Sequence, residues 1–188
     1  TGTTLVAQMV NGCGIGEARV GDIFDKDKYK NFMLRVNQSI GKSISIGVFG
    51  YTGRELVWDS YVQTVSDIRM FGPDLTIDID EKLIINAQYV KRTDSRVFTG
   101  APGGVEDDVM TSGAFAEVIY APKGDMSKWY MTGLWNWVES DFNDLDYSSA
   151  TLHAGYLLRR NMRLVGEYTQ VLVPISYGKV NVGIITAF

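Results

Sequence analysis

The sequence predicts an all-β fold, an antiparallel, up-and-down transmembrane β-barrel with about ten strands. Glycine occurs 20 times and aromatic residues make up 12% of the chain, against only 4 prolines, which suits many strands joined by tight turns. Apolar and polar residues alternate with a period of two, and the sequence contains no convincing apolar stripe at helical spacing. The connections between the predicted strands alternate between long and short along the chain.

Ten segments have the composition of strands and the length, about 9–11 residues, that a tilted strand needs to cross a bilayer. In the second segment, Phe32 and Leu34 share one face while Arg35 lies on the other. Pro73 within the fourth segment would remove one ladder hydrogen bond, so we expect a bulge or an exposed edge there. The predicted strands are 4–12, 31–40, 43–52, 67–77, 82–92, 113–121, 128–138, 150–159, 162–172 and 179–188.

The predicted connections are long at one end of the sheet and short at the other. Only Gly41 and Lys42 join the second and third strands. By contrast, the whole segment 93–112 joins the fifth and sixth strands. Both termini fall at the end with the short turns. Membrane barrels have this asymmetry, with short periplasmic turns and long extracellular loops.

The seventh predicted strand carries a marker of membrane depth. Trp129 and Trp137 lie on one face and are eight positions apart, which along a tilted strand is roughly the height of a ~25 Å apolar band. Tryptophan rings prefer the two membrane–water interfaces, so we expect this face to contact lipid. The predicted membrane-interface residues are Trp129, Trp135, Trp137, Tyr156, Tyr168 and Phe188.

The opposite face of the predicted strands carries charged and amide side chains. Such groups need water or mutual partners, because isolated charges in a dry interior are very costly. A water-filled pore and an interior plugged by ion pairs among arginines and glutamates both meet this need. Ten strands closed on themselves leave a narrow or plugged lumen, whereas a larger barrel leaves a channel. The predicted pore-lining residues are Arg35, Asn37, Asp78, Asn86, Gln88, Glu117, Asn136, His153, Arg159, Arg163, Glu167 and Asn181.

The end of the chain resembles a known family. The segment KVNVGIITAF places Val180, Val182 and Ile184 on one face and ends at Phe188. It resembles the terminal strand of bacterial outer-membrane β-barrel proteins, although Thr186 stands where that family usually has an aromatic residue. The segments FGPDLTIDIDEKLIINAQYVKR and MRLVGEYTQ also resemble hairpins of porin-like barrels.

This resemblance implies a location in the bacterial outer membrane, in contact with outer-membrane lipid and lipopolysaccharide. It also implies that the barrel-assembly machinery reads the last strand through Phe188. Residues 1–188 are then a single barrel domain or the C-terminal part of a larger porin. The resemblance is compatible with a homo-oligomer or a larger complex. No signal peptide is visible, so we expect a mature chain or a fragment.

His153, the only histidine, is a candidate catalytic base. It follows Asp141 and Asp144 and lies near Ser148 and Ser149, and a histidine on a barrel rim can activate a nucleophile when a carboxylate orients it. No recognisable motif surrounds it, so we interpret it as a polar wall residue and expect no enzyme activity and no catalytic residues.

Other candidate sites have simpler interpretations. The acidic segment 141–146 lacks the spacing and glycine of a calcium loop, so we expect a solvated loop and no metal or other cofactor. Cys13 is the only cysteine and is interpreted as a plain thiol. The net charge of -4 argues against nucleic acid as a partner.

The leading functional hypothesis is an outer-membrane porin-like channel for passive diffusion of small polar solutes. A plugged structural or partner-binding barrel that acts through its extracellular loops is the first alternative. A rim-site hydrolase using His153 is the second. A soluble lipocalin-like barrel, with its apolar face turned inward around a ligand, is the third.

Overall fold

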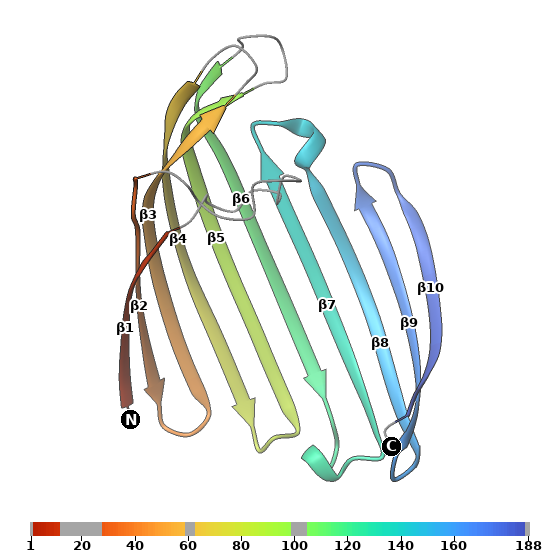
Figure 1. Ribbon diagram of the computed structural model, residues 1–188. Helices are drawn as coiled ribbons and strands as arrows, with labels where there is room; N and C mark the ends of the chain where they lie inside the picture. Colours follow the sequence, from red (N-terminus) through yellow and green to blue (C-terminus); the bar gives the residue numbers. More distant parts are fainter. Residues whose placement is uncertain (1, 12–27, 59–62, 99–104, 187–188) are drawn as a thin grey trace.

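The computed structural model of the chain describes residues 2–11, 28–58, 63–98 and 105–186. These residues form one antiparallel sheet in which ten strands follow one another in sequence order (Figure 1). The predicted all-β, up-and-down arrangement of ten strands is therefore confirmed. The strands are β1 (Gly2–Val10), β2 (Asn31–Ile40), β3 (Ile44–Trp58), β4 (Gln63–Ile79), β5 (Leu83–Phe98), β6 (Val105–Tyr120), β7 (Trp129–Ser140), β8 (Tyr147–Arg159), β9 (Met162–Val173) and β10 (Tyr177–Thr186).

Helical structure in the described part of the chain is limited to two single turns. These are η1 (Gly124–Met126), between β6 and β7, and η2 (Asn143–Leu145), between β7 and β8. None of the described residues belongs to a helix long and apolar enough to cross a membrane.

The four strands β3 to β6 are longer than predicted. They have 15, 17, 16 and 16 residues, and all four extend past the predicted bounds at the end of the sheet where the long loops were expected. Figure 1 shows this half of the sheet rising above β7–β10. Polar residues such as Arg54 and Asp67 made these segments resemble loops, but they pair with one another in the ladder. The predicted long loops after the third and fifth strands are thus partly strand.

Tight turns close the opposite end, as predicted. Gly41 adopts a φ of 66° in the turn between β2 and β3, a conformation that glycine adopts without steric cost. Asp80 and Glu81 also have positive φ, 54° and 58°, between β4 and β5. The carboxylate of Asp78 accepts a hydrogen bond of 2.8 Å from the Glu81 N–H and stabilises this turn.

Pro73 interrupts the ladder without changing its register. Gly72 and Pro73 have no partners in β5, while the pairs on both sides, Phe71 with Lys91 and Asp74 with Gln88, keep one register. A proline lacks the N–H group that a rung requires, which accounts for the gap. In place of the predicted bulge, β4 and β5 lack two residue pairs at this point of the ladder.

Within the described residues, the first and last strands do not pair with each other, so the sheet is open along β1 and β10. Both edges run between the same two ends of the sheet, and both termini lie at the turn end (Figure 1). A row of paired residues that starts at Gly2 in β1 arrives at Lys179 in β10, seven residues before Thr186 at the strand end. The strands are therefore staggered, as tilted strands in barrels are.

The registers assign every strand residue to one of two faces. We call the face that carries Asn136 the polar face and the face that carries Trp135 the apolar face. Among the described residues, all four buried hydrophobic side chains lie on the polar face. They are Ile68, Met70, Val109 and Val171.

Glycines show that the polar face is also the more crowded one. A Cβ atom on Gly47, Gly53 or Gly155 would come within 3.0 Å of a neighbouring side chain, and all three glycines lie on the polar face. On the apolar face, a Cβ atom on Gly50 or Gly133 would meet nothing within 4 Å. Side chains converge on the concave side of a curved sheet, so this difference indicates that the polar face is concave.

Candidate functional site

The polar face carries most of the residues that the sequence predicts to line a pore. Registers place eleven of the twelve on this face, and their role as pore-lining residues stays a prediction. Arg159 is the last residue of β8 and lies beyond an irregularity in the pairing of β8 with β9. The eleven are Arg35, Asn37, Asp78, Asn86, Gln88, Glu117, Asn136, His153, Arg163, Glu167 and Asn181.

An ion pair connects β2 to β4 across the intervening strand. The guanidinium of Arg35 contacts both carboxylate oxygens of Asp74, at 2.9 and 2.8 Å. Gly47 of β3 lies between them, and a Cβ atom there would be 2.5 Å from the Asp74 carboxylate. The missing side chain of Gly47 therefore lets two residues that are two strands apart form an ion pair, in which Oδ1 of Asp74 accepts a hydrogen bond and Oδ2 is in close contact with the guanidinium.

Further polar contacts continue along β4, β5 and β6. Asn86 accepts a hydrogen bond of 3.0 Å from Thr76 and donates one of 3.0 Å to Glu117. Nearer the loop end, Arg92 forms two contacts of 2.6 Å with Asp94, which is only 6% exposed. Glu117 thus interacts with an amide rather than with Arg159 or Arg163, and the polar face of β2–β6 is held by local pairs.

His153 is at the centre of a second group of contacts, on the polar face of β7–β10. Its Nε2 atom is 2.9 Å from the Tyr130 hydroxyl, and its Nδ1 atom is 3.5 Å from a carboxylate oxygen of Glu167. Asn181 donates a hydrogen bond of 3.1 Å to the other oxygen of Glu167. The Arg163 guanidinium lies 5.1 Å from the centroid of the Tyr130 ring. These contacts link four consecutive strands.

The surroundings of His153 differ from those expected of a hydrolase. Its recorded partners are a phenol and a carboxylate, and the structure does not bring the predicted serine to it. Ser149 instead accepts a hydrogen bond of 3.5 Å from Asn136. Asp141 and Asp146 accept bonds of 2.6 and 2.9 Å from backbone N–H groups of β6 and β7. Within the described part of the chain, the hydroxyl beside His153 is therefore that of Tyr130 and not that of a serine.

The acidic segment 141–146 is used to close the loop end of the sheet, through the two backbone contacts just described. Across the described ranges, no three His, Cys, Asp or Glu side chains are grouped closely enough to hold a metal ion. Cys13 lies outside the described residues.

The predicted membrane-interface residues that the structure describes all lie on the apolar face. Trp129 and Tyr156 are paired at the turn end, and Trp137 lies at the loop end of β7. Trp135 and Tyr168 are farther from the strand ends. Phe188 is outside the described residues.

The apolar face has a well-defined band without charge. On β3 the band runs from Ile44 to Thr52, on β4 from Phe71 to Ile79, and on β7 from Trp129 to Trp137. None of the described residues within the band is charged. At ~3.3 Å per residue its length is about 26 Å along the strand. The large hydrophobic side chains exposed in the band are Leu5, Met9, Phe32, Leu34, Ile40, Ile44, Ile46, Phe71, Ile79, Val118, Tyr120, Trp129, Met131, Trp135, Leu152, Tyr156, Leu158, Leu164, Tyr168, Leu172, Val180, Val182 and Ile184.

Charged residues begin on the same face directly beyond the loop end of the band. They include Arg54 on β3, Arg69 on β4, Lys91 on β5 and Glu139 on β7. These four residues were not predicted as site residues from the sequence. Their signal was present on β4, β5 and β7, because in each of these strands the first charge on the apolar face at the loop end follows directly after an aromatic residue.

The chain was compared with protein families and with curated proteins, and neither a family model nor a curated sequence matched it.

Proposed function

We propose that this chain forms a transmembrane β-barrel in the bacterial outer membrane through which small polar solutes diffuse passively. In this proposal the apolar face contacts lipid and the polar face surrounds a water-filled lumen. No cofactor and no catalytic residue is needed, because diffusion requires only a wet, polar path.

One observation carries the proposal: the two faces have the opposite arrangement from a water-soluble β-barrel. A soluble barrel turns its apolar side chains inward, where they form a core or hold a ligand. Here the crowded, concave face is polar, and the face with open surroundings is apolar and free of charge over its whole band. This arrangement favours a lipid environment over the lipocalin-like alternative.

The amount of exposed apolar surface supports the same choice. Nine strand spacings of about 4.8 Å and a band about 25 Å tall give an apolar surface on the order of 1,000 Å². Soluble monomers rarely have apolar patches beyond about 300–600 Å². The total accessible surface is 12833 Å² for a mass of 20.9 kDa, whereas a compact monomer of that mass has about 9,000 Å². Contact with lipid would cover the part of this excess that lies on the apolar band.

The open edges support closure in the membrane. The backbone N–H and C=O groups along the outer sides of β1 and β10 have no ladder partners among the described residues. In a bilayer such groups cost several kcal/mol each when unpaired, so membrane sheets are closed. β1 and β10 run in opposite directions, as an antiparallel seam requires, and further strands could equally lie between them. Closure of ten strands leaves a narrow lumen, and a larger barrel leaves a wider one.

The proposal is tested by refolding the purified chain into phospholipid vesicles. We expect a folded form whose electrophoretic migration changes on heating, and conductance steps in planar bilayers. Swelling of vesicles in sugars of increasing size then gives the width of the lumen. Recovery of a folded monomer in plain buffer without detergent would sink the membrane proposal.

A barrel without a continuous channel, acting through its extracellular end, is the second candidate. It is favoured by the contacts on the polar face, where Arg35 with Asp74 and Asn86 with Glu117 pair with each other across strands. Folded protein in bilayers that gives no conductance and no solute uptake would select this candidate over the channel.

A further inference from the structure

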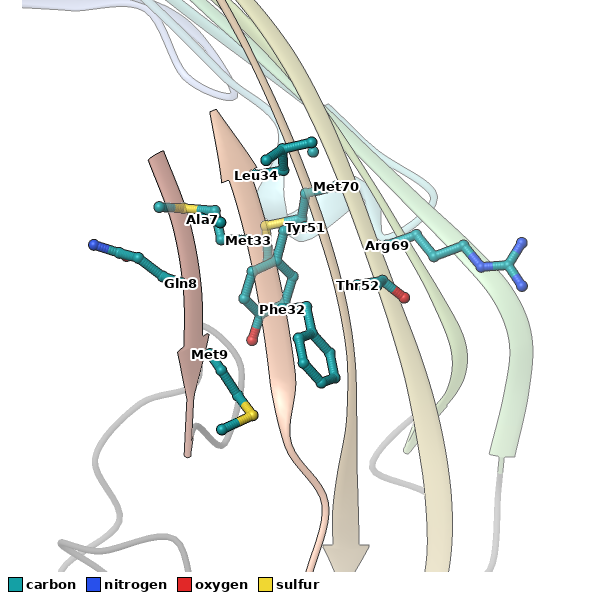
Figure 2. Close-up of a pocket in the computed structure, with 11 residues that line it drawn as sticks. Ala7, Gln8, Met9, Phe32, Met33, Leu34, Tyr51, Thr52, Arg69 and Met70 are labelled. Carbon is teal, nitrogen blue, oxygen red and sulfur yellow. The ribbon is translucent and has the colours of Figure 1, made fainter. Parts of the chain in front are cut away.

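The apolar face has a groove between β2 and β4, about 670 Å³ in volume, which we call the β2–β4 groove (Figure 2). Its apolar-face lining includes Met9, Phe32, Leu34, Gly50, Thr52 and Arg69. Seven of the eleven lining residues lie on the apolar face. The groove therefore opens toward the proposed lipid side.

Gly50 accounts for the shape of the groove. It lies in one row with Leu34 of β2 and Phe71 of β4, whose side chains are 50% and 55% exposed. Gly50 itself has no side chain, and a Cβ atom added there would meet nothing within 4 Å. Two apolar ridges thus flank an open floor that runs along β3, a shape that accommodates an acyl chain lying along the strand.

The loop end of the groove is basic. Arg69 lies in the row just beyond Phe71 on β4, and Figure 2 shows its guanidinium directed away from Phe32. Lys91 of β5 is paired with Phe71 on the same face. Arg54 also lies on this face, but it is neutralised by Asp67 at 2.6 Å. Arg69 and Lys91 are both exposed, and neither forms an ion pair within the described ranges.

We propose that the β2–β4 groove binds a phosphorylated acyl lipid, with an acyl chain over Gly50 and a phosphate against Arg69 and Lys91. The proposal rests on the proposed membrane function. A guanidinium is suited to a phosphate because its fork of N–H donors matches the phosphate oxygens. The basic end of the groove is the long-loop end, which in an outer-membrane barrel faces the outer leaflet. The lipid A part of lipopolysaccharide combines acyl chains with phosphates and is the occupant we assign.

A second hollow on the same face provides an internal control. It has a volume of about 370 Å³ and lies near the turn end of β7–β10, where its lining includes Trp129, Ala154 and Gly166. Gly166 resembles Gly50, because a Cβ atom there would also meet nothing within 4 Å. Among the described residues, no Arg or Lys lines this second hollow. It is therefore an apolar groove that lacks the basic end of the β2–β4 groove.

The test measures lipid A binding to the folded protein in neutral detergent by native mass spectrometry. Arg69→Gln should weaken binding of diphosphoryl lipid A about tenfold, since it removes a charge-assisted contact with the phosphate. Gly50→Leu should weaken it similarly by filling the groove. The matched controls are Lys42→Gln, at the opposite end of the sheet, and Gly166→Leu, in the second hollow, and both should stay within about twofold of the parent.

Three outcomes would overturn the lipid site. They are unchanged affinity in Arg69→Gln, equal binding of phosphatidylcholine and lipid A, or full competition by inorganic phosphate alone. If Gly50→Leu does not fold, the exposed Arg69→Gln variant still decides the question. A parent protein that folds into vesicles but shows one of these outcomes contradicts only the lipid site. A parent that does not fold into vesicles contradicts the proposed function itself.

Discussion

The polar and apolar faces of this sheet differ in how their side chains relate to one another. On the polar face, side chains lie over neighbouring strands and contact partners, as Arg35 does across Gly47 and Tyr130 does across Gly155. On the apolar face, large side chains such as Leu152 and Val182 are 52% and 75% exposed, and a Cβ atom added to Gly50, Gly133 or Gly166 would meet nothing within 4 Å. One face is therefore organised by contacts within the chain, while the other requires a surrounding medium. Matched substitutions on the two faces test this difference.

The largest difference is expected from placing a charge on each face. Leu152→Arg puts a cation in the middle of the apolar band and should cost about 2–4 kcal/mol of folding free energy in vesicles. Leu134→Arg makes the same change on the polar face, beside Glu117 in the register, and should be tolerated. Urea titration of the two variants in vesicles measures the effect. Equal destabilisation by both would contradict the assignment of the faces.

Removing a cation from an ion pair on each face should give the next largest difference. Arg35→Ala leaves the partly buried Asp74 without its partner and should cost roughly 1–3 kcal/mol. Arg54→Ala breaks the pair with Asp67 beyond the apolar band, where the Arg54 side chain is 61% exposed, and should cause no resolvable change. The same urea titration applies. A larger loss in Arg54→Ala than in Arg35→Ala would show that the pair across Gly47 contributes little.

Adding a methyl group to a glycine separates the faces in a third way. Gly47→Ala forces a Cβ atom against the Asp74 carboxylate and should destabilise the fold by about 1–3 kcal/mol. Gly50→Ala meets open space and, by restricting the unfolded chain, should be neutral or stabilising by about 0.5–1 kcal/mol. The midpoints of unfolding report both. A stable Gly47→Ala variant would mean that Arg35 and Asp74 can separate at little cost.

The smallest difference is expected from removing a tyrosine hydroxyl. Tyr130→Phe deletes the contact with His153 and should cost about 0.5–1.5 kcal/mol. Tyr156→Phe on the apolar face removes a hydroxyl with no partner in the described structure and should change stability much less. Unfolding midpoints in vesicles compare the two. If Tyr156→Phe costs as much, its hydroxyl has a partner in the lipid headgroups or water.

Alternation along the sequence was enough to predict the number of strands, their order and the composition of the two faces. Strand ends were less predictable, because in β3–β6 the ladder continues through polar residues such as Arg54 and Asp67 that are typical of loops. Alternation was a good guide within the band because each residue there is either apolar or polar according to its face. Beyond the band, polar and hydrophobic residues such as Leu56 and Ile68 occur on both faces, so the period is lost while the pairing continues.

The contacts within the candidate site could not be predicted, because they depend on register. Arg35 and Asp74 meet only because the two pairings around β3 align them over Gly47. His153 was identified from its residue type, but its neighbours Tyr130 and Glu167 come from two other strands. Likewise, the β2–β4 groove arises from the small residue Gly50 between two large neighbours in adjacent strands, a pattern visible only when the strands are aligned.

The simple order of the strands has a consequence for how the protein assembles. Every strand pairs only with the strands before and after it in the chain, so each pairing closes a short segment and loses little chain entropy. Such hairpins can form one after another along the chain. The seam at β1 and β10 is the exception, because joining these edges directly would bring residues from opposite ends of the chain together. Assembly is therefore expected to be slowest at the seam, and that step is where an external assembly factor would accelerate folding most.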